Sequence, residues 1–284
     1  MAKPRQVLSL HQGQATSDGA GVRLTRVFGG PGVERFDPFL MLDEFGSDNP
    51  DEYIAGFPPH PHRGFETVTY MLDGRMRHED HMGNVGLLER GAVQWMTAAR
   101  GVIHSEMPEQ EAGLMRGFQL WLNLPGKTKL SDPAYQDIPA AKIPRLVTAG
   151  GVEVVVIAGT FSDGQMTQVG AVQRPDTEPL YLDLHLPANA TVSPQVPEGH
   201  LVLLYVYEGN LALQGQPEPV KAGQLVRLGD TGEVALGSDS GCRVLLIAGK
   251  PLKEPIVQYG PFVMNTREEI EQAMRDFHAN RLTA

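Results

Sequence analysis

Short apolar runs separated by glycine and proline dominate this chain. The runs are rich in valine, isoleucine, leucine and aromatic residues, which favour strands. They read TVTYML, VGLLE, AVQWMTA, GFQLWLNL, VEVVVIA, LYLDLHL, LVLLYVY, QLVRL and CRVLLIA. Several strands at short spacing are typical of a barrel or a sandwich. The pattern therefore predicts an all-β protein.

The C-terminal segment TREEIEQAMRDFHANR has the pattern of a helix. Thr266 suits the N-cap, and acidic residues follow it in the first turn. Ile270, Met274 and Phe277 fall on one face at helical spacing. We expect a C-terminal helix that docks on a sheet.

One order of elements occurs twice along the chain: a strand, a glycine, a hairpin, a strand and a second glycine. The glycines are Gly74 and Gly91 in the first half, and Gly209 and Gly223 in the second. The polar, proline-bearing segment KTKLSDPAYQDIPAAKIPRL lies between the two copies and is typical of a linker. We predict two domains, residues 1–140 and 141–284.

Composition narrows the classes of function. The chain has 284 residues, of which 41% are hydrophobic, so it can bury a sizeable core. Its net charge is -10 and its basic residues are scattered, which argues against direct binding of nucleic acid. Cys242 is the single cysteine, so one chain cannot build a disulfide, a cysteine zinc site or an iron–sulfur cluster.

No segment of the sequence indicates a membrane. The N-terminal residues lack the apolar stretch of a signal peptide, and the longest apolar runs are too short to span a bilayer. We expect a cytoplasmic protein.

The segment FPPHPHRGFETVTY holds His60 and His62 one residue apart. Residues i and i+2 of an extended segment project from the same face, so both imidazoles can point to one spot. A second pair, His104 and Glu106, occurs at the same spacing in AARGVIHSEMP. On neighbouring antiparallel strands the two pairs would converge on one ion from opposite sides.

Three imidazole nitrogens and one carboxylate oxygen suit a first-row divalent metal. The corresponding part of the second half offers His200 without a closely spaced partner. We therefore expect the metal in the first half and no metal ligands in residues 141–284.

These motifs resemble the pirin family of the cupin superfamily. The resemblance covers nearly the whole chain, through FGGPGVERFDPFLMLDEF, FPPHPHRGFETVTYMLDG, GAVQWMTAARGVIHSEMP, GFQLWLNLP and PIVQYGPFVMNT. It implies a bicupin, with two jelly-roll-like cupin barrels stacked in one chain and one iron (Fe) in the N-terminal barrel. The ligands carried over by the resemblance are His60, His62, His104 and Glu106. Other divalent first-row metals can occupy such a site.

The resemblance also implies a function. It implies a quercetinase, a flavonol 2,3-dioxygenase that opens the heterocycle with loss of carbon monoxide. The substrates would be dioxygen and a small aromatic, flavonol-like molecule, and Glu106 would be the general base. The alternative is a non-enzymatic, iron-binding regulator that binds a transcription factor or a metabolic enzyme.

Other polar residues near these motifs have weaker assignments. Glu66 occupies the glutamate position of the general cupin pattern, but we expect it to be structural or to lie behind the ligands. His78 and His81, in RHEDHMGN, are expected to be solvated. Arg63 and Gln119 either line the pocket or are structural.

Overall fold

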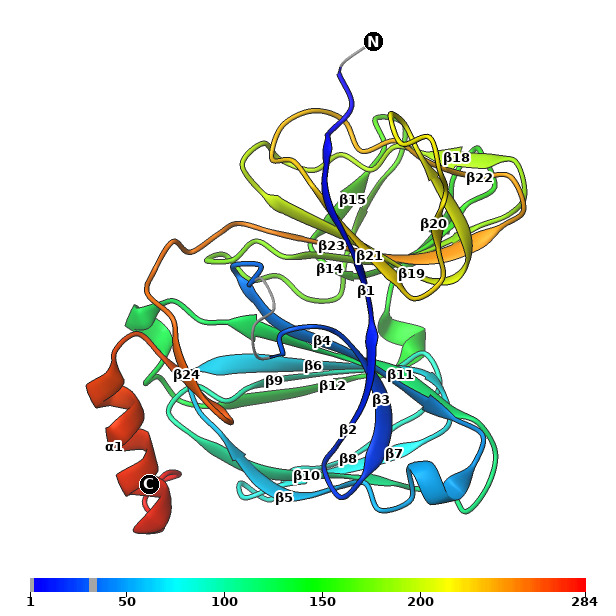
Figure 1. The fold of residues 1–284 in the computed structure, drawn as a ribbon. Coiled ribbons are helices and arrows are strands. Elements are labelled where there is room, and N and C mark those ends of the chain that lie inside the picture. Colours follow the sequence, from blue (N-terminus) through cyan, green and yellow to red (C-terminus); the bar gives the residue numbers. More distant parts are fainter. Residues whose placement is uncertain (1–2, 31–34) are drawn as a thin grey trace. The chain divides into compact units, whose positions relative to one another are not determined.

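The protein is described by a computed structural model that covers residues 3–30 and 35–284 (Figure 1). Its residues form two compact units. The N-terminal barrel comprises Gln14–Ala140 with Leu252–Ala284. The C-terminal barrel comprises Ala141–Pro251 together with the described residues up to Gly13.

The ends of the chain differ from the predicted domains 1–140 and 141–284. The break near residue 140 is present, but the N-terminal strand β1 (Val7–Gln12) pairs with β21 (Gln224–Leu228) of the C-terminal barrel. The C-terminal segment instead joins the N-terminal barrel, because the backbone N–H of Arg63 donates to the carbonyl oxygen of Pro261 and the N–H of Val263 donates to that of Arg63. Sequence order alone does not reveal either exchange.

Two antiparallel sheets form the N-terminal barrel. One has seven strands in the order β12-β9-β6-β11-β4-β3-β2, and the other has four in the order β5-β10-β7-β8. Their bounds are β2 (Gln14–Asp18), β3 (Val22–Phe28), β4 (Phe39–Ser47), β5 (Phe57–His62), β6 (Phe65–Asp73), β7 (Met76–Asp80), β8 (Val85–Leu88), β9 (Val93–Thr97), β10 (Val102–Pro108), β11 (Met115–Asn123) and β12 (Ala134–Ile138). The hairpin β24 (Val257–Tyr259) and β25 (Phe262–Met264) also belongs to this unit.

The C-terminal barrel is built around the strand path β1-β21-β19-β23-β17-β14-β13. Its further strands have the bounds β13 (Arg145–Val147), β14 (Glu153–Ala158), β15 (Thr160–Ser162), β16 (Thr167–Val169), β17 (Leu180–Leu186), β18 (Ala190–Val192), β19 (Leu201–Leu213), β20 (Val220–Lys221), β22 (Leu236–Ser238) and β23 (Cys242–Gly249). Inward residues such as Val154, Leu182 and Leu246 are fully buried in one apolar cluster.

Short 3-10 helices occur at Pro50–Glu52, Gly126–Thr128 and Ala140–Lys142.

The apolar runs singled out in the sequence all lie in strands, so the predicted all-β class is confirmed. Gly74, Gly91, Gly209 and Gly223 all have positive φ angles, which explains why glycine recurs at the same place in both copies.

The segment predicted as a linker is only partly one. Its residues Ala134–Ile138 form β12, which pairs with β9, and Lys129 is buried with 1% of its surface exposed. The N-terminal barrel reaches Ala140 and the C-terminal barrel continues from Ala141, so the boundary between the two units falls inside this segment. Burial does not alternate along β12, where Tyr135 is half-buried, Gln136 and Asp137 are exposed and Ile138 is buried, so the sequence pattern does not distinguish this strand from a polar connection.

The predicted helix is α1 (Arg267–His278). Thr266 caps it in a reciprocal pair with Glu269, as the sequence indicates. Ile270 is buried on the predicted face, whereas Phe277 is 36% exposed and contacts the buried ring of Phe262 with centroids 6.2 Å apart. In the described residues no helix is both long and apolar enough to cross a bilayer.

Candidate metal centre

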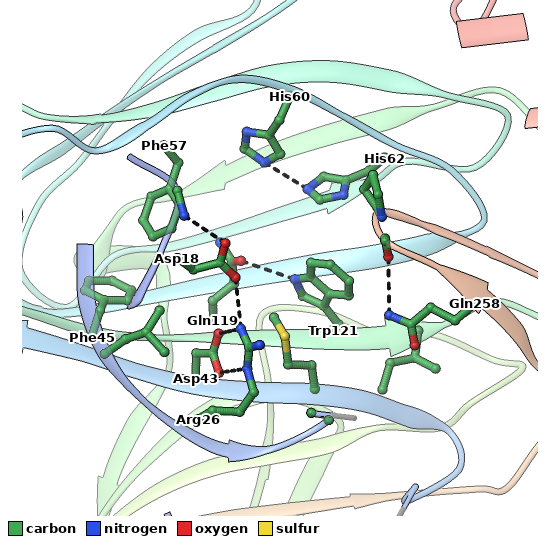
Figure 2. A pocket seen from close by; sticks show the side chains of 18 of the residues that line it. Asp18, Arg26, Asp43, Phe45, Phe57, His60, His62, Gln119, Trp121 and Gln258 are labelled. Carbon is green, nitrogen blue, oxygen red and sulfur yellow. Dashed lines mark hydrogen bonds and ion pairs between the residues drawn. The ribbon is translucent and has the colours of Figure 1, made fainter. Parts of the chain in front are cut away.

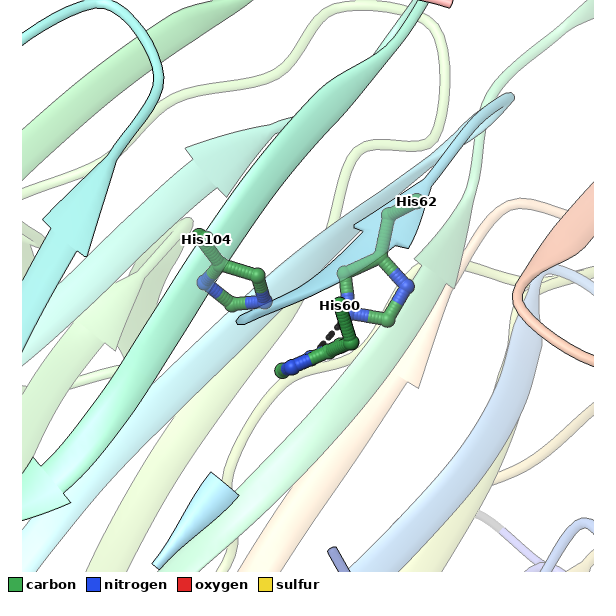
Figure 3. A group of neighbouring side chains, drawn as sticks. All are labelled: His60, His62 and His104. Carbon is green, nitrogen blue, oxygen red and sulfur yellow. Dashed lines mark hydrogen bonds between the residues drawn. The ribbon is translucent and has the colours of Figure 1, made fainter. Parts of the chain in front are cut away.

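His60, His62 and His104 converge inside the N-terminal barrel (Figure 3). β5 and β10 are antiparallel neighbours, and pairing places His60 directly opposite His104. One ligand nitrogen of each ring lies within 4.8 Å of the others. Three of the four residues predicted as metal ligands are therefore brought together.

The geometry of this cluster fits a bound metal. Nε2 of His60 lies 3.1 Å from Nε2 of His62, and two nitrogens bound to one metal at right angles, each at about 2.1 Å, are separated by about 3 Å. Nε2 of His104 is buried and forms no hydrogen bond with the described residues. A metal ion would satisfy this nitrogen, which otherwise costs free energy as a buried polar atom.

The cluster also favours the protonation state that ligands need. Burial, followed by the neighbouring imidazole of His60, lowers the pKa of His62 well below its ordinary value. Burial, followed by the imidazoles of His62, His60 and His78, lowers the pKa of His104 in the same direction. Neutral imidazoles keep the lone pair that binds a metal.

Glu106, the fourth predicted ligand, lies outside the group of three histidines defined by that distance. It is 1% exposed, and both of its oxygens accept hydrogen bonds from the facing sheet. Oε1 accepts from the hydroxyl of Thr69 at 2.9 Å, and Oε2 accepts from the amide of Gln119 at 2.9 Å. Its assignment as ligand and base stays a prediction.

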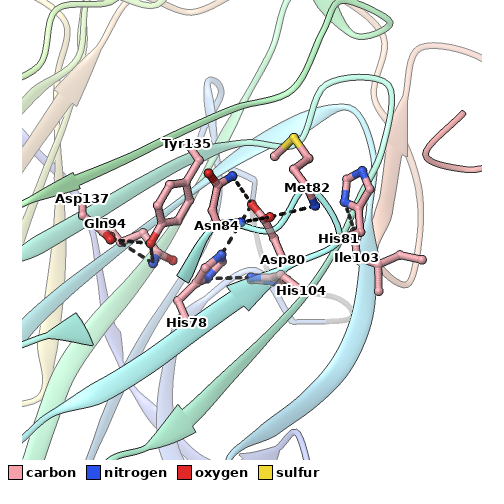
Figure 4. Close-up of polar contacts among 10 residues, drawn as sticks. All are labelled: His78, Asp80, His81, Met82, Asn84, Gln94, Ile103, His104, Tyr135 and Asp137. Atoms are coloured by element: carbon pink, nitrogen blue, oxygen red, sulfur yellow. Dashed lines mark hydrogen bonds and ion pairs between the residues drawn. The ribbon is translucent and has the colours of Figure 1, made fainter. Parts of the chain in front are cut away.

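His78 was expected to be solvated, and that prediction is wrong. Its side chain is fully buried, and its Nδ1 lies 3.3 Å from Nδ1 of His104 (Figure 4). The ring stacks on Tyr135 with centroids 4.7 Å apart. His81, by contrast, is exposed as predicted. The difference arises because residues 76, 78 and 80 of β7 all face inward.

The pocket behind His78 is closely packed with polar groups. The hydroxyl of Tyr135 donates to Asp137 at 2.6 Å and accepts from the amide of Gln94 at 3.1 Å. A Cβ atom at Gly86 would lie 2.2 Å from that hydroxyl, so only glycine allows this approach.

A row of polar side chains crosses the seven-stranded sheet. Strand pairing sets its members directly opposite one another: Asp137 on β12, Gln94 on β9, Thr69 on β6, Gln119 on β11, Asp43 on β4 and Arg26 on β3. Directly opposite residues share one face of a sheet. Two members bind Glu106 of β10, so the row lies on the face turned toward the histidines.

A cavity of about 820 Å³ opens beside His60 and His62 (Figure 2). This volume is within the range of about 300 to 1,000 Å³ that small-molecule sites occupy. Aromatic side chains form much of the apolar lining: Phe45, Phe57 and Trp121. The cavity thus combines flat apolar walls with candidate metal ligands.

Trp121 and Gln119 connect this cavity with the buried carboxylate. The indole lies edge-on to the ring of His62, with centroids 5.2 Å apart. Its Nε1 donates to Oε1 of Gln119 at 3.2 Å, and the amide of Gln119 donates to Glu106. Of the two roles considered for Gln119, lining the pocket or a purely structural one, its position in the cavity wall supports the first.

The other two residues with open assignments have structural contacts. Arg63 pairs with Asp276 at 2.8 Å and donates to the carbonyl oxygen of Leu282, so it holds the C-terminal segment. Glu66 accepts a hydrogen bond from Thr97 at 2.6 Å and is not part of the histidine group.

The sequence reading missed an ion-paired group in the cavity wall. Arg26 donates to Asp43 through two nitrogens, at 3.0 and 2.8 Å, and to Asp18 at 2.9 Å. A signal was present, because Asp43 interrupts the apolar run FLMLDEF and a buried carboxylate requires a partner.

In the C-terminal barrel the three histidines, His11, His185 and His200, lie apart from any such group among the described residues. His185 contacts Asp183 at 2.9 Å and Glu153 at 3.3 Å through different ring nitrogens. His200 is buried and lies 3.5 Å from Glu178. The expectation that residues 141–284 supply no metal ligands stays a prediction.

Comparison with known families and proteins adds independent evidence. The family model described as Pirin matches residues 21–122, and the model described as Pirin C-terminal cupin domain matches residues 181–283. Both halves of the chain are therefore covered.

Individual relatives match almost end to end. A Pseudomonas aeruginosa protein named "Putative quercetin 2,3-dioxygenase" is 66% identical over 98% of this chain and 98% of that protein. A Caulobacter vibrioides protein named "Pirin-like protein" is 48% identical over 98% of this chain and 99% of that protein. The crystal structure of a quercetin 2,3-dioxygenase from Acinetobacter baumannii is similar with a TM-score of 0.90 and 32% identity, covering 99% of each chain.

Proposed function

The chain belongs to the pirin family of bicupins, and from this premise we propose that it is a metal-dependent dioxygenase of the quercetin 2,3-dioxygenase type. Its substrates are a flavonol and dioxygen. Both atoms of dioxygen enter the product, the heterocycle opens, and the carbon that carried the 3-hydroxyl leaves as carbon monoxide.

One observation carries this proposal: a group of three histidines, two of them buried, opens onto a cavity with aromatic walls within a single barrel. Three neutral imidazoles hold a first-row metal and leave further coordination positions for other ligands. The names of a 66% identical relative and of a similar solved structure point to the same reaction.

We assign the metal to His60, His62 and His104, with Glu106 as the fourth ligand and Fe as the metal, one per chain. A bound first-row metal would supply Lewis acidity toward the ionised 3-hydroxyl and the redox chemistry that dioxygen requires. Oε1 of Glu106 accepts one hydrogen bond from Thr69 and Oε2 accepts one from Gln119, so each oxygen keeps acceptor capacity for a further contact.

Glu106 is also the group that takes the 3-hydroxyl proton in this proposal. Hydrogen bonds from Thr69 and Gln119 fix the orientation of its carboxylate before substrate arrives. The indole of Trp121 donates a hydrogen bond to Gln119, which in turn donates to Glu106. A flat substrate ring that packs against the indole is therefore linked to the base through these two hydrogen bonds. Phe57 and Phe45 exclude water from the apolar part of the cavity.

The test is a direct measurement of turnover. The purified protein is loaded with Fe(II) under argon, mixed with quercetin and dioxygen, and followed by oxygen uptake and carbon monoxide release in parallel. We expect equal amounts of both, and none from a His62→Ala control. Loading separate samples with manganese, cobalt or nickel identifies the metal that supports the fastest reaction.

Absence of oxygen uptake and carbon monoxide at full loading with each metal would reject the dioxygenase proposal. The iron-binding regulator would then be the function to pursue, by comparing capture of defined partner proteins by ferrous and ferric samples.

A further inference from the structure

The cavity has a polar end as well as a metal-binding end. In Figure 2, His60 and His62 lie on one side of the pocket and Arg26 lies on the other, with Trp121 and Gln119 between them. The histidines, Glu106 and the aromatic walls account for the reacting end. The charged group around Arg26 has no role in that chemistry.

Arg26 is held in a fixed orientation. It lies directly opposite Asp43 in the pairing of β3 with β4, and its Nε and Nη2 donate to the two oxygens of that carboxylate. Such a forked pair fixes the guanidinium plane. Hydrogen bonding to Asp43 raises the pKa of Arg26 above its ordinary value, so the group is always charged.

One nitrogen of Arg26 is left available. Nε and Nη2 make the three hydrogen bonds to Asp43 and Asp18, whereas no acceptor among the residues that the structure describes bonds to Nη1. The Arg26 side chain is 23% exposed and lines the cavity, so Nη1 offers two N–H donors to a bound molecule.

Asp18 places an acceptor next to this donor. Its Oδ2 accepts from Arg26, its Oδ1 accepts from the backbone N–H of Gly19 at 2.8 Å, and its side chain is 54% exposed. Each oxygen therefore keeps a lone pair directed toward solvent or a ligand. Donor and acceptor stand side by side in the wall of one cavity.

The charges of this group select the class of ligand. Two carboxylates surround one guanidinium, so the group carries a net negative charge and disfavours an anionic substituent such as a carboxylate or a phosphate. A neutral hydroxyl fits better, because it accepts from Nη1 of Arg26 and donates to Asp18 at the same time. Two adjacent hydroxyls on one ring can use both groups.

We propose that Asp18, Arg26 and Asp43 form a specificity subsite that binds the hydroxyl groups on the outer aromatic ring of the substrate. This inference rests on the proposed function, because a flavonol whose 3-hydroxyl is at the histidines extends its outer ring across the cavity. Leu24 and Phe45 line the same cavity and supply apolar contact for the body of that ring.

The experiment compares three flavonols that differ only in the outer ring: quercetin with two adjacent hydroxyls, kaempferol with one, and galangin with none. Binding is measured under argon on the zinc-loaded protein, by calorimetry and by quenching of tryptophan fluorescence. We expect quercetin to bind at least about tenfold more tightly than galangin, as one or two hydrogen bonds to charged groups would give.

Two variants assign the preference to the subsite. Arg26→Lys keeps a positive charge beside Asp43 but removes Nη1, and Asp18→Asn removes a charged acceptor; both should bring the three affinities to within about twofold of one another. Arg23→Lys is the matched control, because Arg23 lies on the same strand with a side chain that is 64% exposed and pairs with Glu52. It should leave the ranking unchanged.

The outcomes separate this inference from the proposed function. Equal binding of all three flavonols by the parent, or an unchanged ranking in both Arg26→Lys and Asp18→Asn, would reject the subsite even if quercetin is turned over. If the parent prefers quercetin, the two variants lose this preference and the parent releases no carbon monoxide, the subsite would be supported and the dioxygenase proposal rejected.

Discussion

Nδ1 of His104 lies 3.3 Å from Nδ1 of His78, a residue that the sequence reading left in solvent. A metal on Nε2 of His104 requires the proton of that ring to be on Nδ1, where it can be donated to His78. The proton of His78 is then on Nε2, which forms no hydrogen bond with the described residues and lies 3.9 Å from the carboxylate of Asp80. The contact between the two Nδ1 atoms would therefore hold the tautomer and the orientation of His104 as a candidate ligand.

Replacing His78 should therefore weaken metal binding without removing a ligand. His78→Phe keeps a ring beside Tyr135 but offers no acceptor to His104, and we expect the metal dissociation constant to rise by about 10- to 100-fold. His78→Gln keeps an acceptor and should recover part of the loss. Chelator competition measures the constants, and the absorption spectrum of cobalt-loaded protein reports the ligand geometry.

The matched control for this experiment is His81→Phe, three residues away and exposed. A rise in the dissociation constant of the same size in both variants would mean that the hairpin as a whole, and not the contact of His78 with His104, supports the site. Thermal unfolding of the metal-free proteins separates a loss of stability from a loss of affinity.

His104→Ala should lose most of the bound metal. Elemental analysis of the parent, purified with iron available, is expected to give about one first-row metal per chain, because nitrogens of two buried histidines and one half-buried histidine converge on one point. The variant removes one of them and leaves an incomplete ligand set. Metal retained at the parent level in His104→Ala, with His278→Ala as a control from the exposed end of α1, would contradict the assignment.

Glu106→Gln should lower turnover by about 100-fold or more, as expected for loss of a general base. The structure adds a second consequence. An amide at position 106 presents a donor as well as an acceptor, and either the hydroxyl of Thr69 or the side chain of Gln119 can accept from that donor. Acceptance by Gln119 would turn its oxygen away from Nε1 of Trp121, so a changed tryptophan emission spectrum in the metal-free variant identifies Gln119 as the acceptor and an unchanged one identifies Thr69.

Turnover of Glu106→Gln at the parent rate would remove the base role while leaving the histidine group intact. Trp121→Phe supplies the control for the spectrum, because the remaining Trp95 is buried on β9 and 1% exposed. An emission change that persists in the double variant would have to originate at Trp95.

The group of three histidines was predictable because it depends on local spacing and on one strand pair. His60 and His62 share a face by alternation, and pairing of β5 with β10 brings His104 opposite His60. His78 was predictable in principle by the same rule, since Met76, two residues earlier, is apolar and buried. The segment RHEDHMGN is polar at almost every position, so the alternation of buried and exposed residues along β7 does not show as an alternation of apolar and polar residues.

The polar row and the Arg26 subsite could not be predicted in the same way. They depend on the register of strands that are far apart in the sequence, such as Asp43 opposite both Arg26 and Gln119. A shift of one residue in any pairing would send these side chains to the other face of the sheet. Register is set by the packing of the whole barrel, which composition and spacing do not encode.

Lys129 provides a prediction about stability and pH. It is 1% exposed, and its ammonium donates to the carbonyl oxygens of Gly64 and Val263 at 2.7 and 3.0 Å and to Asn123 at 2.6 Å. Burial lowers the pKa of Lys129 to about 8, although Glu254 and Glu269 act in the opposite direction. The charged form therefore costs free energy in the folded protein.

The sign of the pH dependence follows from this shift. Below about pH 8 both the folded and the unfolded chain carry the charge, and the cost is fully present. Between about pH 8 and pH 10.5 the folded chain has lost the proton and the unfolded chain still holds it, so the contribution of Lys129 to the free energy of unfolding rises with pH. The full rise is on the order of 3 kcal/mol.

Urea unfolding of the metal-free parent and of Lys129→Met, from pH 7 to pH 10, isolates this contribution as the difference between the two proteins. Lys129→Met should be less stable than the parent at every pH, because it leaves the three acceptors around position 129 without a donor. The deficit should grow above pH 8. Lys127→Met, at an exposed position two residues away, should show no such growth. A deficit for Lys129→Met that stays constant across the range would mean that the lysine keeps its ordinary pKa in the folded barrel.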